Sequence, residues 1–168
     1  KGLIADTLIA MTDTQTAALT TNQISNLQTS AVEALNSTDV QSWSTTQLGA
    51  LTSKQLAGLT TTALADFTDT QLGSLTSTQL RGLTTTQLNS MADTQLNAIT
   101  VTDLSTTQIK GMTTTAIAAL STTQAQSLTA TQIGQLSAAG LEALSSEEIQ
   151  GWSNAQLAAV TSRQLAGL

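Results

Sequence analysis

The side chains of this chain that could do chemistry are hydroxyls and a few carboxylates. His, Cys and Tyr are absent from its 168 residues, which excludes imidazole acid–base catalysis, thiolate nucleophiles, disulfides and zinc sites. Glu147 and Glu148 are adjacent carboxylates, but they lack a third metal ligand and fit the solvated first turn of a helix better. We therefore predict a protein that is not an enzyme, with no catalytic residue, no metal site and no cofactor.

Most of the hydroxyls belong to an eight-residue repeat that runs from end to end. Its consensus, numbered here as positions 1 to 8, is apolar-Thr-x-Thr-Gln-apolar-x-small, as in residues 83–90 (LTTTQLNS). Position 1 falls at Leu3, Met11, Leu19, Leu27, Leu35, Trp43, Leu51, Leu59, Phe67, Leu75, Leu83, Met91, Ile99, Leu104, Met112, Leu120, Leu128, Leu136, Leu144, Trp152, Val160 and Leu168. Such repetition predicts a quasi-linear array.

Positions 2 and 5 have the spacing of a helix capping box. Position 2 is Ser or Thr in 17 of 21 units, and position 5 is Gln in 13 units and Glu in one more. In a capping box the hydroxyl accepts from the third helical amide, while the Gln side chain accepts from the amide of the capping residue. The clearest pairs are Thr52 with Gln55, Thr76 with Gln79, and Thr84 with Gln87.

Positions 1 and 6 flank this box where a hydrophobic staple places its two apolar residues. Predicted core pairs are Leu51 with Leu56 and Leu83 with Leu88. The three aromatic residues, Trp43, Phe67 and Trp152, all occupy position 1. We interpret them as core substitutions for Leu, with sugar or partner contacts as the alternative.

The period of eight requires the helix to stop and restart in every unit. In one continuous helix each copy would rotate by about 80° and spread the apolar stripe around the axis. In one continuous strand positions 1 and 6 would face opposite sides. We predict an all-α solenoid with one short capped helix per repeat, in which small residues at position 8 let neighbouring helices approach. A β-solenoid is the alternative.

Residues 1–168 are predicted to form a single tandem array with one defect near residue 104. Leu104 serves as position 6 of one unit and position 1 of the next, so three residues are missing. We expect a tolerated deletion that kinks the superhelix, with a functional hinge as the alternative. Lys1 and Gly2 match positions 7 and 8, and Leu168 is a bare position 1, which predicts a fragment of a longer repeat protein.

Charge and hydropathy exclude two classes of partner. The net charge is −6 with only five basic residues, whereas nucleic-acid binding needs a clustered basic face. No apolar run approaches the roughly 18 residues of a membrane span. We therefore predict neither nucleic-acid binding nor a transmembrane segment.

Thr at position 4 has no capping role and recurs in 13 units. Regular rows of hydroxyl and methyl groups would suit ice or glycan binding. A simpler interpretation is that Thr keeps a short first turn soluble without adding charge. Binding through the Thr rows is therefore the alternative to a purely structural function.

The chain resembles the Thr/Gln-rich octapeptide tracts of very large secreted or surface exoproteins of proteobacteria, which are often adhesin-like. Residues 120–125 (LSTTQA) and 128–136 (LTATQIGQL) carry the resemblance. It implies a bacterial protein that is secreted or displayed on the cell surface, and a spacer or scaffold role. We predict a stalk or filament segment that self-associates through its repeat ends, where Leu3 and Leu168 would be exposed, with other surface components or glycans as further partners.

Overall fold

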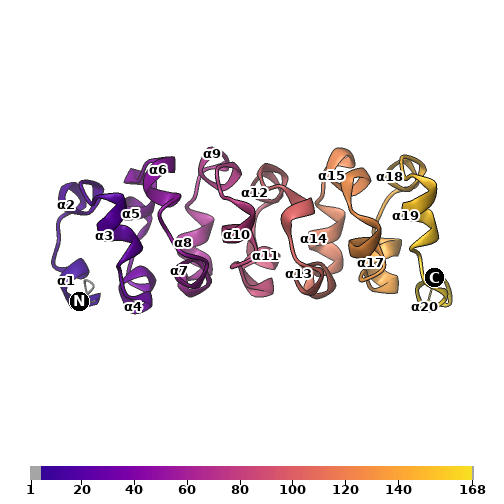
Figure 1. Cartoon of the computed structure of the whole chain (residues 1–168), viewed down its shortest axis with the longest axis horizontal. Coiled ribbons are helices and arrows are strands. Elements are labelled where there is room, and N and C mark those ends of the chain that lie inside the picture. Colours follow the sequence, from indigo (N-terminus) through magenta and orange to yellow (C-terminus); the bar gives the residue numbers. More distant parts are fainter. Residues whose placement is uncertain (1–4, 168) are drawn as a thin grey trace.

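The computed structural model describes residues 5–167, which form 20 α-helices and one 3₁₀ helix and contain no strand. The α-helices are four to six residues long. This all-helical solenoid (Figure 1) confirms the predicted fold class and excludes the β-solenoid. None of these helices has the length and apolar character needed to cross a membrane. Leu3 and Leu168 lie outside the described residues.

The helices follow one another with two-residue to four-residue connections, as these bounds show: α1 (Ala5–Ile9), α2 (Asp13–Ala17), α3 (Thr21–Ser25), α4 (Thr29–Glu33), α5 (Ser37–Ser42), α6 (Thr45–Leu48), α7 (Ser53–Gly58), α8 (Thr61–Ala65), α9 (Asp69–Gly73), α10 (Ser77–Leu80), α11 (Thr85–Ser90), α12 (Asp93–Ala98), η1 (Val101–Asp103), α13 (Thr106–Gly111), α14 (Thr114–Ala118), α15 (Thr122–Ser127), α16 (Ala130–Ile133), α17 (Ala138–Glu142), α18 (Ser146–Gln150), α19 (Asn154–Ala158) and α20 (Ser162–Leu165).

From α2 onward each helix starts at position 3, directly after an extended residue, and in all but α4, α12 and η1 the side chain of that residue caps the helix. Before α11, Thr84 has φ −77° and ψ 157°, and its side chain accepts from the Gln87 amide. The helix ends when Met91, position 1 of the next unit, returns to φ −65° and ψ 143°. The chain therefore alternates one short helix with one extended corner, which turns it toward the next helix.

Three helices complete one turn of the superhelix, because each helix packs on the third element before or after it. Examples are α4 on α7, α7 on α10, and α2 on α5. The stacked turns form one long rod in Figure 1. The contacts and chain order place the helices in three rows: the first row is α1, α4, α7, α10, η1, α15 and α18; the second is α2, α5, α8, α11, α13, α16 and α19; the third is α3, α6, α9, α12, α14, α17 and α20.

A single apolar core runs along the rod and is built from positions 1 and 6. The position 6 residues Leu48, Leu56, Leu64, Leu72, Leu80 and Leu88 are at most 1% exposed. Position 1 residues are nearly as buried, and together they form one continuous cluster. Each short helix is therefore stabilised mainly by the turns above and below it, as in other repeat arrays.

Glycine at position 8 marks the closest approach between successive turns. A Cβ atom on Gly82 would lie 2.6 Å from the Ser53 main chain, and one on Gly58 would overlap Cγ2 of Thr29. Neither glycine has a positive φ, so the backbone conformation does not favour glycine at either residue. The space excludes a larger residue most firmly at Gly82, where the neighbour is main chain and not a side chain.

The three-residue defect is absorbed by the 3₁₀ helix η1, which takes the place of one α-helix. Val101 and Leu104 are both buried in the core, and η1 packs between α10 and α15 in the first row. In Figure 1 the turns continue in one line through α12 and α13, so the kink that we expected is not visible there.

Candidate functional site

The residues assigned to capping boxes lie at the helix starts and bond to one another. Gln55 N donates to Thr52 Oγ1 at 3.3 Å, and Thr52 N donates to Gln55 Oε1 at 2.7 Å. The matching pairs of distances are 3.3 and 3.0 Å for Thr76 and Gln79, and 3.2 and 2.7 Å for Thr84 and Gln87.

The other end of each Gln amide joins its helix to the preceding turn. Gln87 Nε2 donates to the main-chain carbonyls of Leu56 and Leu59, both at 2.8 Å. These acceptors are position 6, 31 residues earlier, and position 1, 28 residues earlier. We call this pair of bonds the Gln bridge. It is formed by Gln55, Gln71, Gln79, Gln87, Gln95, Gln108, Gln124, Gln132 and Gln164. Gln47 and Gln156 make a variant of it, in which the first acceptor is the position 7 carbonyl 30 residues earlier, that of Ala17 or Gln126.

In the Gln bridge, both N–H groups and the oxygen of the Gln side-chain amide have hydrogen-bond partners. Gln87 Oε1 accepts from both the amide and the hydroxyl of Thr84, while its two N–H groups serve the carbonyls below. The side chain is only 2% exposed, and an unpaired buried amide would be costly. No buried side-chain nitrogen or oxygen of the described residues lacks a partner.

Across the defect the Gln bridge keeps its geometry and changes only its sequence spacing. Gln108 Nε2 reaches Leu80 and Leu83, 28 and 25 residues earlier, instead of 31 and 28. Gln124 does the same with Leu96 and Ile99. The shortened unit therefore still contributes one helical element to the superhelical turn, as each complete unit does.

The predicted core residues lie inside the rod. Leu51 and Leu83 are each 2% exposed, and Leu56 and Leu88 are fully buried. Trp43 and Trp152 are 2% and 5% exposed. Their side chains face the core, so neither offers an exposed ring face to a sugar.

Both tryptophans also hydrogen-bond to the turn below. Trp43 Nε1 donates to the carbonyl of Thr16 at 3.0 Å, and Trp152 Nε1 to that of Ala125 at 2.9 Å. Each acceptor is a position 6 residue 27 places earlier. Thr16 and Ala125 are the two position 6 residues of the chain that are not large and aliphatic, so each indole fills the volume that a small side chain leaves.

The capping role of Oε1 in the position 5 Gln was predicted from the sequence. The hydrogen bonds that Nε2 of the same Gln donates to the preceding turn were not predicted. The available signal was the preference for Gln over Glu at position 5, 13 units against one. A capping box accepts either residue, whereas only an amide can also donate to carbonyls.

The adjacent carboxylates occupy a capping site. Glu148 is 8% exposed, and its Oε2 accepts from Ser145 N at 2.6 Å and from Ser145 Oγ at 2.9 Å. Glu147 is exposed in the same first turn. Within residues 5–167, no group of three or more acidic residues is arranged to hold a metal ion.

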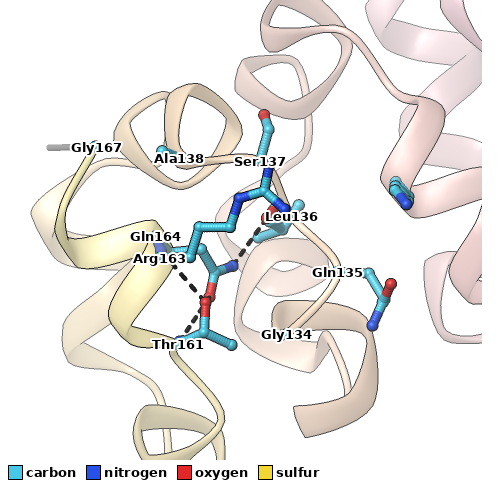
Figure 2. A pocket seen from close by; sticks show the side chains of 10 residues that line it. Gly134, Gln135, Leu136, Ser137, Ala138, Thr161, Arg163, Gln164 and Gly167 are labelled. Carbon is cyan, nitrogen blue, oxygen red and sulfur yellow. Dashed lines mark hydrogen bonds between the residues drawn. The ribbon is translucent and has the colours of Figure 1, made fainter.

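A cleft of about 540 Å³ lies between α20 and the corner that joins α16 to α17. Figure 2 shows Arg163 extending across this cleft toward Ser137, while Gln164 bonds below it to Leu136 and Thr161. The lining residues are Lys110, Gly134, Gln135, Leu136, Ser137, Ala138, Thr161, Arg163, Gln164 and Gly167. They include two cations and the hydroxyls of Ser137 and Thr161, both of which cap helices, but no carboxylate or imidazole that could act as a general base.

A second cleft, of about 360 Å³, opens where the core meets solvent at the last turn. It is lined by Leu141, Glu142, Leu144, Ile149, Trp152, Leu157, Val160 and Leu165. Leu157 and Leu165 occupy position 6 but are 45% and 59% exposed. This face is therefore the open end of the core.

Comparison with known proteins supports a repeat tract. Residues 26–61 match the family model of the ALTTAQ repeat, a stretch that begins before α4 and ends in α8. No curated protein matches the chain, and no solved structure matches it.

Proposed function

We propose that this chain is a non-enzymatic structural module, a rod segment in the stalk or filament of a large secreted or cell-surface bacterial protein. The observation that carries the proposal is the Gln bridge, which repeats along the rod and joins each turn to the one before. The buried Gln side chains hold adjacent turns together, and the core is continuous from Leu8 in α1 to Trp152 after α18. Such an array holds its two ends at a distance that is set by the number of stacked turns. The secreted or surface location rests on the resemblance of the repeat.

A spacer should shorten by whole turns without losing its fold. Deleting residues 60–83 removes three units and joins Leu59 to Thr84, so every later Gln keeps its present sequence spacing to the carbonyls that accept from it. Small-angle X-ray scattering should show an unchanged cross-section and a maximum dimension reduced by about 8–10 Å, the distance between packed helices. Loss of helical circular dichroism, or a change in cross-section, would contradict a spacer.

One observation favours the binding alternative. In the second row, position 4 is Thr in six successive turns: Thr14, Thr38, Thr62, Thr86, Thr107 and Thr131. All six are exposed. The first row places Lys54 and Glu147 at this position, and the third row places Asn22 and Arg163 there. The second row therefore presents one line of hydroxyl and methyl groups free of charge.

Two assays test this alternative. Thermal hysteresis and ice recrystallisation measure ice binding, and a glycan array measures sugar binding. A variant with Thr62, Thr86 and Thr107 changed to Lys should lose either activity if the row is responsible. The matched control changes Thr46, Thr70 and Thr94, which are exposed at position 4 of the third row, and should retain the activity.

A further inference from the structure

In two units, position 5 carries a buried carboxylate where most units have Gln. Glu148 in α18 is 8% exposed, and Asp39 in α5 is 7% exposed. One oxygen of each carboxylate makes the capping contact that Gln Oε1 makes elsewhere. Glu148 Oε2 accepts from Ser145 N at 2.6 Å, and Asp39 Oδ2 accepts from Asn36 N at 3.1 Å. The second oxygen therefore takes the place of Gln Nε2, the atom that donates to the preceding turn.

The second oxygen of Glu148 lies opposite two carbonyl oxygens and cannot donate to them. α18 packs on α15, and at the spacings of 31 and 28 residues that Gln bridges use, the carbonyls belong to Ile117 and Leu120. The main-chain amide of Leu120 donates to Ile117 O at 3.2 Å, but no side chain of residues 5–167 donates to either carbonyl. Glu148 Oε1 likewise accepts no hydrogen bond from a described residue. Three oxygen atoms therefore converge with no side-chain donor between them.

Asp39 repeats this arrangement in another part of the rod. α5 packs on α2, and the carbonyls at the same two spacings belong to Leu8 and Met11. No side chain of the described residues donates to these carbonyls or to Asp39 Oδ1. Because Asp has one methylene group fewer than Gln, its carboxylate stays about 1.5 Å further from the carbonyl pair. The space between carboxylate and carbonyls is therefore larger at Asp39 than at Glu148.

A hard metal cation is the partner that suits such a set of oxygens. A buried, ionised carboxylate is costly beside carbonyl oxygens unless a donor or a positive charge lies between them. Carboxylate and main-chain carbonyl oxygens are the usual ligands of Ca²⁺, which accepts flexible geometry and completes its shell with water. Mg²⁺ demands a near-ideal octahedron and suits two fixed carbonyls less well. Two of the three ligands come from the main chain of the preceding turn, so the spacing of acidic residues along the sequence does not reveal them.

We propose that Glu148 and Asp39 are each the carboxylate ligand of a calcium site between two stacked helices. Between α15 and α18 the ion binds Glu148 Oε1 and the carbonyls of Ile117 and Leu120, and the second site uses the matching atoms between α2 and α5. The ion replaces the two N–H groups of a Gln bridge and joins the same pair of turns. Neither site uses the outer face of the first or last turn. With one carboxylate for each ion, the Kd should be about 10⁻⁴–10⁻³ M.

The variants that remove the sites should keep the fold. Glu148→Gln and Asp39→Gln each place at position 5 the amide that donates to the carbonyl pair in other units, so the turns stay joined while the anionic ligand is lost. The double variant combines the two substitutions. The matched control is Glu147→Gln with Asp69→Asn, which removes two carboxylates that are exposed in the first turns of α18 and α9.

Equilibrium dialysis of chelator-treated protein against Ca²⁺ counts the sites. The unmodified chain and the control should each bind two Ca²⁺ per chain. Each single variant should bind one, and the double variant should bind none up to about 10 mM, ten times the weakest expected Kd. Far-UV circular dichroism of every variant should first show the helical signal of the unmodified chain.

Thermal unfolding gives an independent readout, because an ion that binds only the folded chain raises its unfolding temperature. In chelator, Glu148→Gln should unfold at a higher temperature than the unmodified chain, since Gln supplies the missing donors. Saturating Ca²⁺ should raise the midpoint of the unmodified chain by several degrees and leave that of the double variant unchanged. The advantage of Glu148→Gln over the unmodified chain should therefore shrink when calcium is added.

Three results would overturn the calcium proposal: an unmodified chain that binds no Ca²⁺ up to about 10 mM, a double variant that still binds two ions, or a control that loses binding as the double variant does. Equal binding of Mg²⁺ by the unmodified chain would contradict the assignment to calcium. The proposal goes beyond the rod function and does not depend on it. Scattering by the chain lacking residues 60–83 tests the rod separately, and in chelator.

Discussion

The indole nitrogen of Trp152 donates a hydrogen bond to the main-chain carbonyl of Ala125, 2.9 Å away and 27 residues earlier. Trp43 has the same relationship with Thr16, at 3.0 Å. In both pairs the largest side chain of the repeat lies against a small residue where other turns have Leu, Ile or Val. A large side chain in one turn therefore compensates for a small side chain in the turn before it, and the core stays filled.

Ala125→Leu should destabilise the rod by about 1–3 kcal/mol, because the added side chain meets the indole of Trp152 in a filled core. Ala125 is fully buried. Combining it with Trp152→Leu restores the usual pair and should return stability to within about 1 kcal/mol of the unmodified chain. Urea unfolding midpoints of the unmodified chain, the two single variants and the double variant give the double-mutant cycle. Additive losses in the double variant would mean that the two sites are not coupled.

Much of the local structure was predictable, because capping boxes and staples act within one unit. The position of Thr84, Gln87 and Leu88 within the repeat was enough to place a helix start. The number of units per superhelical turn was not predictable from a period of eight. The capping box and staple of a unit are the same whichever other unit of the chain packs against it. The long-range spacings of 25, 27, 28 and 31 residues appear only once the chain is wound.

Alanine should be costly in place of one glycine, Gly82, and harmless in place of another, Gly134. Gly82→Ala should cost about 1–3 kcal/mol, because a Cβ would lie 2.6 Å from the Ser53 backbone and the turns would have to separate. Gly134→Ala should instead be neutral or stabilising by up to about 1 kcal/mol. Its new Cβ would meet nothing closer than 3.4 Å. Thermal unfolding of both variants makes the comparison, and equal losses would argue against the close approach.

Thr84, the N-cap of α11, and Thr86 and Leu88 within α11 should differ in their sensitivity to substitution. Thr84→Ala should cost about 1 kcal/mol, because it removes the cap, and Thr84→Asp should be tolerated. Thr86 is exposed and makes no side-chain hydrogen bond in the described structure, so Thr86→Ala should be nearly neutral. Leu88→Ala should cost about 2–5 kcal/mol, since this side chain is fully buried. Equal effects at Thr84 and Thr86 would be incompatible with the helical register.

Glu148→Gln should stabilise the rod by about 1–2 kcal/mol. Glu148 caps Ser145 but donates to neither carbonyl at the usual spacings, those of Ile117 and Leu120, and Gln would supply both bonds. Glu147→Gln is the matched control, because that side chain is exposed in the same turn and its loss of charge should change stability little. A decrease in unfolding temperature with Glu148→Gln, relative to the control, would show that position 5 does not need a donor.

The central claim, that Gln side chains hold successive turns together, is tested most directly by placing the same substitution at two sites. Gln87→Glu keeps the capping box but replaces two donors to Leu56 and Leu59 with an oxygen, whereas Gln15→Glu makes the same change where Nε2 has no acceptor in the described structure. Native-state hydrogen exchange at low concentration measures the local free energy of opening around each site. We predict a loss of about 2 kcal/mol or more around Gln87 and almost none around Gln15. Equal effects at the two sites would contradict the Gln bridge.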